Sequence, residues 1–148
     1  MEKVKIEEIR PIMEECFDEG SGFTFKPGGT SMLPYIRGTR DLVTIRRYEG
    51  GAKKYDVVFF KRDSGKYVMH RIIGKKGSDH LVCGDNQCWK ELVRDDMIFA
   101  YECCVSKDGK EMKKGVLYGI YCRTLFIRRF YIRGKRWIVN HILKGRGK

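Results

Sequence analysis

A serine and a histidine in this sequence have the types and surroundings that nucleophilic chemistry requires. Ser31 lies in the segment GGTSMLP (28–34), where two glycines precede the hydroxyl and a proline fixes the turn that follows. Such a segment can hold a serine in an exposed loop. His70 belongs to the residue type that titrates near neutral pH and can accept a hydroxyl proton. Taken alone, Ser31 could be an ordinary turn residue and His70 a half-buried strand histidine.

Several segments together resemble, in order, the motifs of the S24/S26 serine peptidases, the group of the signal peptidases and the LexA-like self-cleaving repressors. The matching segments are GTSMLP (29–34), GTRDLV (38–43), KYDVVF (54–59), MHRIIG (69–74) and CGDN (83–86). They are similar to the serine box, two following strands, the base segment and the Gly-Asp-Asn box, with Tyr55 where glycine is usual. The resemblance covers about residues 23–105, and ordered motifs are more specific than any one of them.

The resemblance implies a serine endopeptidase in which Ser31 attacks a peptide carbonyl. His70 matches the histidine-type general base of the family, so it is expected to take the serine proton and return it to the leaving amine. Asp85, in the Gly-Asp-Asn box, is the residue expected to orient His70, with Asp95 and Asp96 as alternatives. Arg71 is expected to face away from His70 and to pair structurally.

Residues next to the serine are expected to bind substrate and shape the cleft: Gly29, Thr30, Met32 and Pro34. The Ser31 backbone N–H is the expected oxyanion donor. Lys66 is rejected as the base, because four residues of strand separate it from His70 by about 13 Å. The expected substrate is a peptide or protein segment that binds in extended form by strand addition, with small side chains at the cut as the resemblance implies.

The elements expected around these residues are mostly strands. Short β-type segments divided by turns are expected at 23–26, 41–47, 56–61, 66–73, 80–84, 96–106 and 111–117. The turn KDGK (107–110) joins the last two. Without crossover helices, these strands predict a mainly β fold, a curled antiparallel sheet of the signal peptidase/LexA-like type. An apolar stripe at 4–17, interrupted by Pro11, predicts a short N-terminal helix.

The charge of the chain is concentrated at its end. Residues 1–112 hold 20 Lys and Arg against 19 Asp and Glu, whereas residues 113–148 hold 11 Lys and Arg and no acidic residue. With the apolar stripe at 4–17 and the domain that the resemblance implies, this change of charge divides the chain into three expected parts. They are an N-terminal helix (1–22), a peptidase-like domain (23–117) and a basic amphipathic helix (118–148) with a potential break at Gly134. The basic tail predicts an anionic partner, an anionic membrane in preference to nucleic acid. Its apolar stripe could instead pack on the β body.

The sequence also excludes several classes of protein. Its apolar runs are far shorter than the ~20 residues of a membrane-spanning helix. Its charged beginning is unlike a secretory signal, so we expect a cytoplasmic protein, with contact at the inner membrane face through the tail as the alternative. The six cysteines have neither zinc spacing nor a secreted context, so we expect reduced thiols, no metal and no cofactor.

Two alternatives to a peptidase acting on other chains differ in their support from the sequence. A self-cleaving LexA-like regulator would need an Ala-Gly or Cys-Gly bond before the serine, and residues 1–30 contain neither. The same segment is too short for a helix-turn-helix domain. The second alternative is a catalytically weak or inactive peptidase fold with a binding or regulatory role, whose basic tail contacts membrane or nucleic acid.

Overall fold

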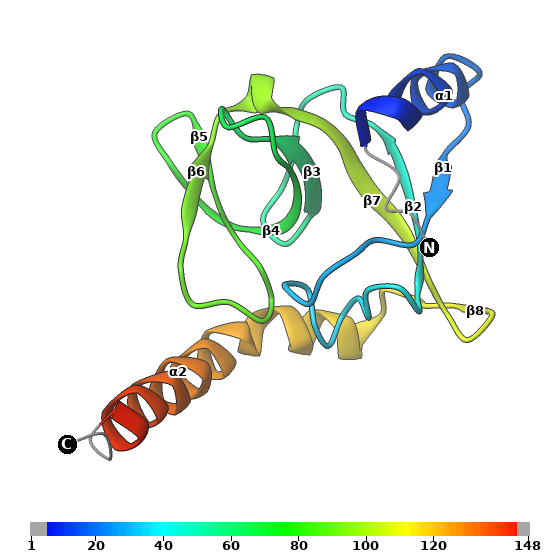
Figure 1. The fold of residues 1–148 in the computed structure, drawn as a ribbon. Coiled ribbons are helices and arrows are strands. Elements are labelled where there is room, and N and C mark those ends of the chain that lie inside the picture. The colour runs from blue at the N-terminus through cyan, green and yellow to red at the C-terminus, as the bar shows by residue number, and fades with distance from the viewer. Residues whose placement is uncertain (1–5, 145–148) are drawn as a thin grey trace.

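The structure, a computed structural model, describes residues 6–144 as one curled antiparallel sheet with a helix at each end of the chain (Figure 1). The helices are α1 (Ile6–Asp18) and α2 (Val116–Lys144), and a 3-10 turn covers Asp95–Met97. The strands within the described residues are β1 (Phe23–Phe25), β2 (Leu42–Arg47), β3 (Val57–Lys61), β4 (Tyr67–Lys76), β5 (Asp79–Cys83), β6 (Glu91–Val93), β7 (Ile98–Lys107) and β8 (Lys110–Glu111).

The strands follow the order β1-β2-β7-β3-β4-β5-β6, and β8 pairs with β7 beside this path. β4 pairs with β3 from Tyr67 to Arg71, but its pairing with β5 begins only at Arg71. Residues 67–70 of β4 therefore have a strand on one side and, within residues 6–144, none on the other. This free strand edge lies beside the serine loop.

The core has two parts, and β3 contributes to both. Val57 and Phe59 pack in the first part, with α1 and the buried residues that follow the serine, whereas Val58 and Phe60 pack in the second, between the β4-β5 and β6-β7 regions. Side chains alternate across a strand, so a strand that is buried on both faces has a continuous apolar run, as here. Met32 and Ile36 anchor the serine loop in the first part of the core.

The expected fold class is confirmed: the sheet is curled and antiparallel, with a short N-terminal and a long C-terminal helix. Positive φ angles at Asp108 and Gly109 make the expected tight turn between β7 and β8. The strand expected at 111–117 was wrong beyond Glu111, since the chain leaves the sheet and α2 begins at Val116. The strand β6 was not expected, because its three residues are too few for an alternating pattern.

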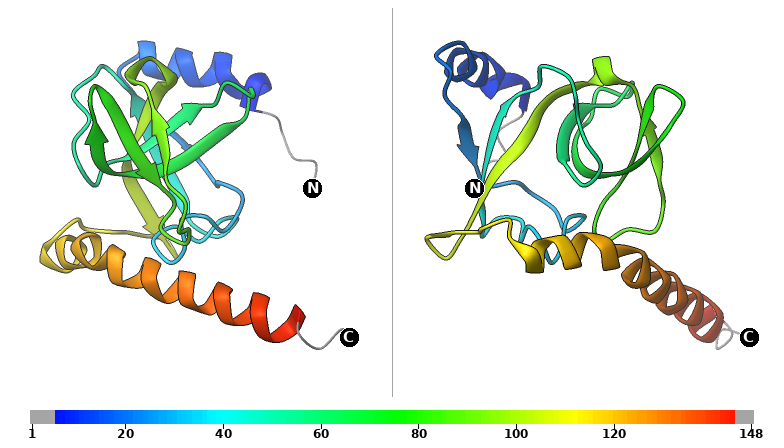
Figure 2. Two further views of the ribbon diagram at one scale, coloured as in Figure 1. Left: turned by 90° about the vertical axis from the view of Figure 1, so that its left-hand side faces the viewer. Right: turned by 180° about the vertical axis from the view of Figure 1, so that it is seen from behind.

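The helix α2 has two halves with different surroundings. Tyr118, Tyr121, Cys122 and Leu125 face the β body, and Cys122 and Leu125 are buried. The helix continues through Gly134, and its second half extends beyond the sheet (Figures 1 and 2). There the exposed large apolar residues are Phe126, Ile127, Phe130, Tyr131, Trp137, Ile138 and Val139. The boundary expected at residue 117 therefore falls inside a helix that is half integrated into the fold.

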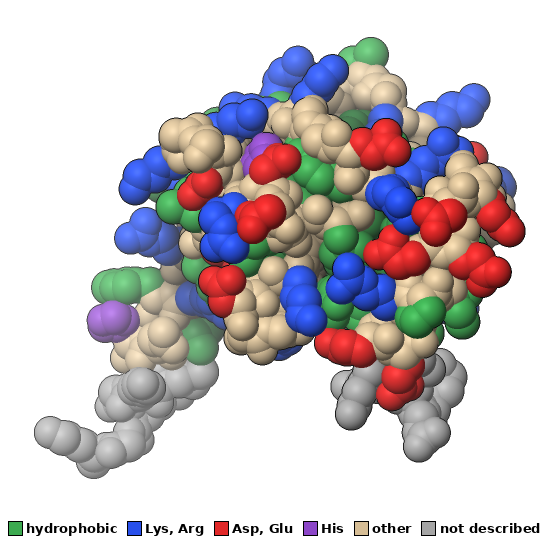
Figure 3. Space-filling model, turned by 90° about the horizontal axis from the view of Figure 1, so that it is seen from above, with side chains coloured by type: hydrophobic (Ala, Val, Ile, Leu, Met, Phe, Trp, Pro, Cys, Tyr) green, Lys and Arg blue, Asp and Glu red, His purple; other side chains and the backbone are tan. Residues whose placement is uncertain are grey.

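The surface opposite α2 differs from the helix in charge. It carries both Lys and Arg and Asp and Glu side chains, with most of the acidic ones on the right of the view (Figure 3). Most of the exposed large apolar residues of the described chain lie on α2, where the excess of basic residues is also found. Neither helix in residues 6–144 combines the length and the apolarity that crossing a membrane requires.

This division of α2 predicts that substitution by alanine lowers the free energy of unfolding by very different amounts in its two halves. Leu125 is 2% exposed and Phe130 is 71% exposed. We expect Leu125→Ala to lower the free energy of unfolding by about 2–5 kcal/mol, and Phe130→Ala by less than about 0.5 kcal/mol. Urea unfolding followed by circular dichroism measures both. Similar losses at the two positions would contradict the division.

Candidate active site

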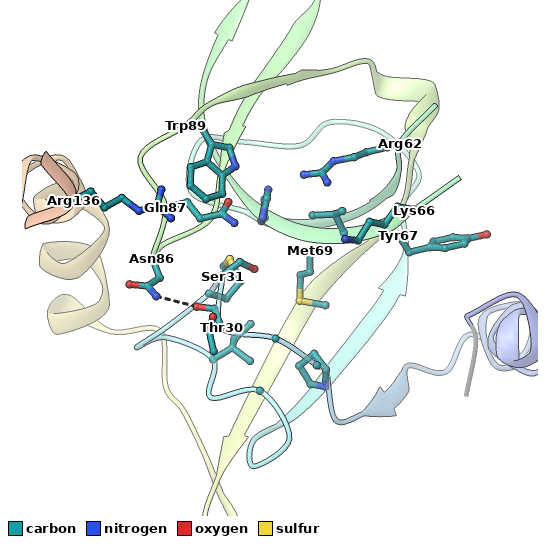
Figure 4. Close-up of a pocket in the computed structure, with 18 residues that line it drawn as sticks. Thr30, Ser31, Arg62, Lys66, Tyr67, Met69, Asn86, Gln87, Trp89 and Arg136 are labelled. Atoms are coloured by element: carbon teal, nitrogen blue, oxygen red, sulfur yellow. Dashed lines mark hydrogen bonds between the residues drawn. The ribbon is translucent and has the colours of Figure 1, made fainter. Parts of the chain in front are cut away.

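A cleft of about 620 Å³ brings together residues that are far apart in the sequence (Figure 4). Its walls are the serine loop (27–32), the free edge of β4 (67–70) and the loop that follows β5 (86–89). Ser31 and His70 both line it. The cleft thus contains the expected nucleophile and the expected base.

The serine loop is held by backbone contacts with neighbouring segments. Gly29 has a φ of 82°, which favours glycine, and a Cβ at Gly38 would collide with the Gly29 carbonyl. The Asn86 N–H donates to the Ser31 carbonyl over 2.8 Å, and the Asn86 side chain donates to the Thr30 carbonyl over 3.2 Å. These bonds join the serine loop to the segment Cys83–Asn86.

Gly84 shows why this approach needs glycine. A Cβ on Gly84 would lie 2.7 Å from the Ser31 carbonyl oxygen and 2.8 Å from the Gln87 side chain. Its φ is not positive, so the requirement is for space and not for backbone freedom. The Gly-Asp-Asn sequence therefore has a physical role. Gly84 allows the two segments to approach each other, and the hydrogen bonds of Asn86 hold them together.

The expectation that Asp85 orients His70 was wrong, because its carboxylate is committed elsewhere. Both of its oxygens accept hydrogen bonds from Arg71, over 2.9 and 2.7 Å, and the Tyr121 hydroxyl donates to it over 2.9 Å. Arg71 and His70 are neighbours on β4, so their side chains point to opposite faces of the sheet. Asp85 lies on the Arg71 face. The expected structural pairing of Arg71 is thereby confirmed.

The two alternative carboxylates also have other partners. Asp95 accepts hydrogen bonds from Tyr48 and His80, at the far end of the β5 hairpin. Asp96 pairs with Arg94 in an exposed turn. Neither carboxylate is within hydrogen-bonding distance of His70.

The carboxylate beside His70 is Glu91, the first residue of β6. Its Oε1 lies 2.7 Å from His70 Nδ1, and Arg62 donates two hydrogen bonds of 2.8 Å to the same group. Burial alone would raise the pKa of Glu91. The hydrogen bonds and positive charge of Arg62, together with the contact to the His70 ring, lower this pKa instead. An ionised carboxylate can only accept, so Nδ1 carries the hydrogen. The His70 Nε2 atom is then the proton acceptor.

Sequence reasoning missed Glu91 because β6 was not expected. The available signal is that Glu91 is the only acidic residue between Asp85 and Asp95, directly before the apolar pair Leu92-Val93. Pairing of Glu91 with Val82 places β6 beside β5, and β5 is the strand next to β4. That register depends on a contact between separate segments of the chain.

Burial sets the protonation state of His70. The side chain is 2% exposed, and this desolvation lowers the pKa of His70 below its ordinary value of 6.5, although the Glu91 carboxylate opposes the shift. The imidazole is therefore neutral at pH 7. A neutral ring with a fixed tautomer is the form that a general base needs.

The remaining expected site residues are divided between the cleft and its surroundings. Gly29, Thr30 and Met32 line the cleft with Ser31. Pro34 does not line it: this residue borders a separate groove with Tyr35, and Lys107 donates to its carbonyl. Within residues 6–144, the Ser31 hydroxyl and backbone N–H have no protein hydrogen-bond partner. Both groups are therefore available to a bound ligand.

The cysteines and the comparisons with other proteins assign no function. All six cysteines are free thiols, and residues 6–144 contain no cluster of side chains suited to a metal ion. Comparisons of the chain with models of protein families, with curated proteins and with solved structures found no match. The cleft and its chemistry are therefore what points to a function.

The Glu91–His70 contact predicts how His70 titrates. By NMR of the imidazole resonances, we expect the His70 pKa to lie below 6.5 and to fall further in Glu91→Gln, because the substitution removes the charge that opposes the effect of burial. Glu111→Gln, which removes an exposed carboxylate on β8, is the control. A higher or unchanged pKa in Glu91→Gln would contradict the assignment.

The same shift has a consequence for stability in the wild-type protein. Between the lowered pKa of folded His70 and the ordinary value of 6.5, the unfolded chain binds more protons than the folded protein. We therefore expect the contribution of His70 to stability to decrease as the pH falls through 6.5 towards the folded pKa.

Proposed function

We propose that this protein is a serine endopeptidase in which Ser31 is the nucleophile, His70 the general base and Glu91 the residue that orients the base. The observation that carries this proposal is the buried His70, bonded through Nδ1 to Glu91 in the cleft that Ser31 lines. The resemblance of residues 23–105 to S24/S26 peptidases supports it independently of the geometry.

The chemistry follows from these roles. The Ser31 hydroxyl oxygen would bond to the carbonyl carbon of the substrate while His70 Nε2 takes the hydroxyl proton, and the Glu91 carboxylate would stabilise the resulting imidazolium. The Ser31 N–H, which has no partner among the described residues, could bond the developing oxyanion. As the C–N bond breaks, His70 would return the proton to the leaving amine. Water, activated by the same imidazole, would then hydrolyse the acyl-enzyme.

The free edge of β4 supports an extended peptide as the substrate. Ile72 directs its backbone N–H and C=O towards the β3 side, where they bond to Asp56 and Tyr55 over 2.8 Å each. Alternation along the strand turns the backbone groups of Met69 and Tyr67 to the opposite side, where β5 has already ended at Cys83. A peptide could pair with these groups as an added antiparallel strand.

The nucleophile and base can be tested by substitution. In a mass-spectrometric assay on a peptide library, we expect Ser31→Ala and His70→Ala to lower kcat/KM on the order of 10⁴-fold or more. Wild-type activity should rise with pH with a midpoint below 6.5, because a protonated His70 cannot accept the serine proton. Cuts that persist in Ser31→Ala would contradict the mechanism.

Two controls separate catalysis from folding in this assay. Ser21→Ala changes an exposed serine between α1 and β1, and it should cut as the wild type does. A serine-reactive phosphonate probe should label wild-type protein but not Ser31→Ala. Circular dichroism of each variant shows whether the sheet is intact.

We also propose that residues 118–148 contact anionic membranes peripherally. The supporting observation is that Phe126, Phe130, Tyr131 and Trp137 are all more than half exposed, on a basic helix without acidic residues. Such a helix can lie at a membrane surface with its apolar side chains in the interface. This contact would place the cleft at the inner membrane face, and it is compatible with peptidase activity.

Vesicle flotation tests the membrane contact. We expect binding to vesicles that contain phosphatidylserine and weaker binding as salt rises. Phe130→Ala and Arg133→Gln should each weaken binding by roughly three- to tenfold, by removing an inserted side chain and a basic charge. Leu42→Ala, at an exposed apolar residue on β2, is the control. Equal binding to vesicles of phosphatidylcholine alone would contradict an electrostatic contact.

A further inference from the structure

The charges around the cleft are of one sign. Among the described residues that line it, Arg62, Lys66 and Arg136 are basic, and none is acidic. The charge of Arg62 is balanced by its two hydrogen bonds to Glu91. Lys66 and Arg136 are exposed, and within residues 6–144 neither has a carboxylate at salt-bridge distance. The cleft therefore offers two uncompensated positive charges to a ligand.

These two charges approach the cleft from separate elements. Lys66 precedes β4, and Arg136 belongs to the second half of α2. Figure 4 shows Arg136 on one side of the cleft and Lys66 on the other, with Ser31 between them in this view. A peptide that follows the free edge of β4 past Ser31 has one cation near each end of its bound segment.

Arg136 is held in a position that suits carboxylate recognition. Its guanidinium lies over the Trp89 ring at 4.7 Å, and Nη1 lies 3.9 Å from Cys88 Sγ. Stacking on an aromatic ring orients the planar group and leaves its N–H edge available for a bidentate bond to a carboxylate. Trp89 is 46% exposed and itself lines the cleft, so a ligand can reach this pair.

We propose that the cleft selects peptides with acidic side chains on both sides of the scissile bond, one read by Lys66 and the other by Arg136. This inference rests on the proposed peptidase function and adds the substrate class. Small residues at the cut itself are compatible with it, because the two cations lie away from Ser31. Each matched acidic residue should raise kcat/KM by about three- to tenfold, the range for partly exposed charge-assisted contacts.

The test uses four peptides with one cut sequence: a neutral parent with Gln on both sides, a Glu peptide for each side, and a peptide with both Glu residues. We expect wild-type kcat/KM to be highest for the doubly acidic peptide, and the preference to shrink as salt rises. Lys66→Glu and Arg136→Glu should each reverse the preference on one side and keep it on the other. Lys75→Glu, an exposed reversal at the far end of β4, should leave both preferences unchanged.

Equal rates for the neutral and acidic peptides, or preferences that survive both reversals, would overturn the inference. If no peptide is cut, the proposed function fails instead. The charge selection is then decided by fluorescence anisotropy of the same four peptides on the Ser31→Ala protein. Tighter binding of the acidic peptides, lost on charge reversal, would support the inference, and equal binding would refute it. Arg136→Gln provides a milder variant if reversal disturbs α2.

Discussion

The ion pair between Arg71 and Asp85 is the constraint on which the site depends. Both side chains are completely buried, and a buried charge without its partner would be strongly destabilising. The pair is completed by tyrosines from two other segments: Tyr35 lies over the Arg71 guanidinium at 4.6 Å, Tyr118 accepts a hydrogen bond from it, and Tyr121 donates to Asp85. One interaction thus fixes β4, the segment after β5, the segment that follows the serine loop and α2 relative to one another.

This constraint also positions the candidate base, because β4 has two faces. The Arg71 side chain lies on one face of β4, where it bonds to buried Asp85. Because side chains alternate along a strand, His70 lies on the other face, beside Glu91. Each face carries its own arginine-carboxylate pair, Arg71 with Asp85 and Arg62 with Glu91. The first holds the framework. The second keeps Glu91 ionised, so that the neutral imidazole has one defined tautomer.

Local patterns account for what the sequence predicted correctly. Alternating apolar residues and the KDGK turn located most strands within one to three residues, and the glycines around Ser31 indicated an exposed loop. Glu91 and Asp85 were harder because their partners depend on strand pairing. The sequence places Asp85 near the base in the chain but does not show on which face of β4 it lies. Similarly, nothing local indicates that the chain after Glu111 leaves β7 and forms α2.

The helix α2 joins the β body to the basic tail, two parts of the molecule that differ in charge. Its first turns supply Tyr118 and Tyr121 to the buried ion pair, while Arg136, in its exposed half, lies against Trp89 at the cleft. One continuous helix connects these contacts, so the position of Arg136 follows from packing at the beginning of α2. Part of the basic charge of the tail, at Arg136, is therefore directed into the cleft. The other basic residues lie beside exposed apolar residues beyond Leu125, where an anionic surface could bind them.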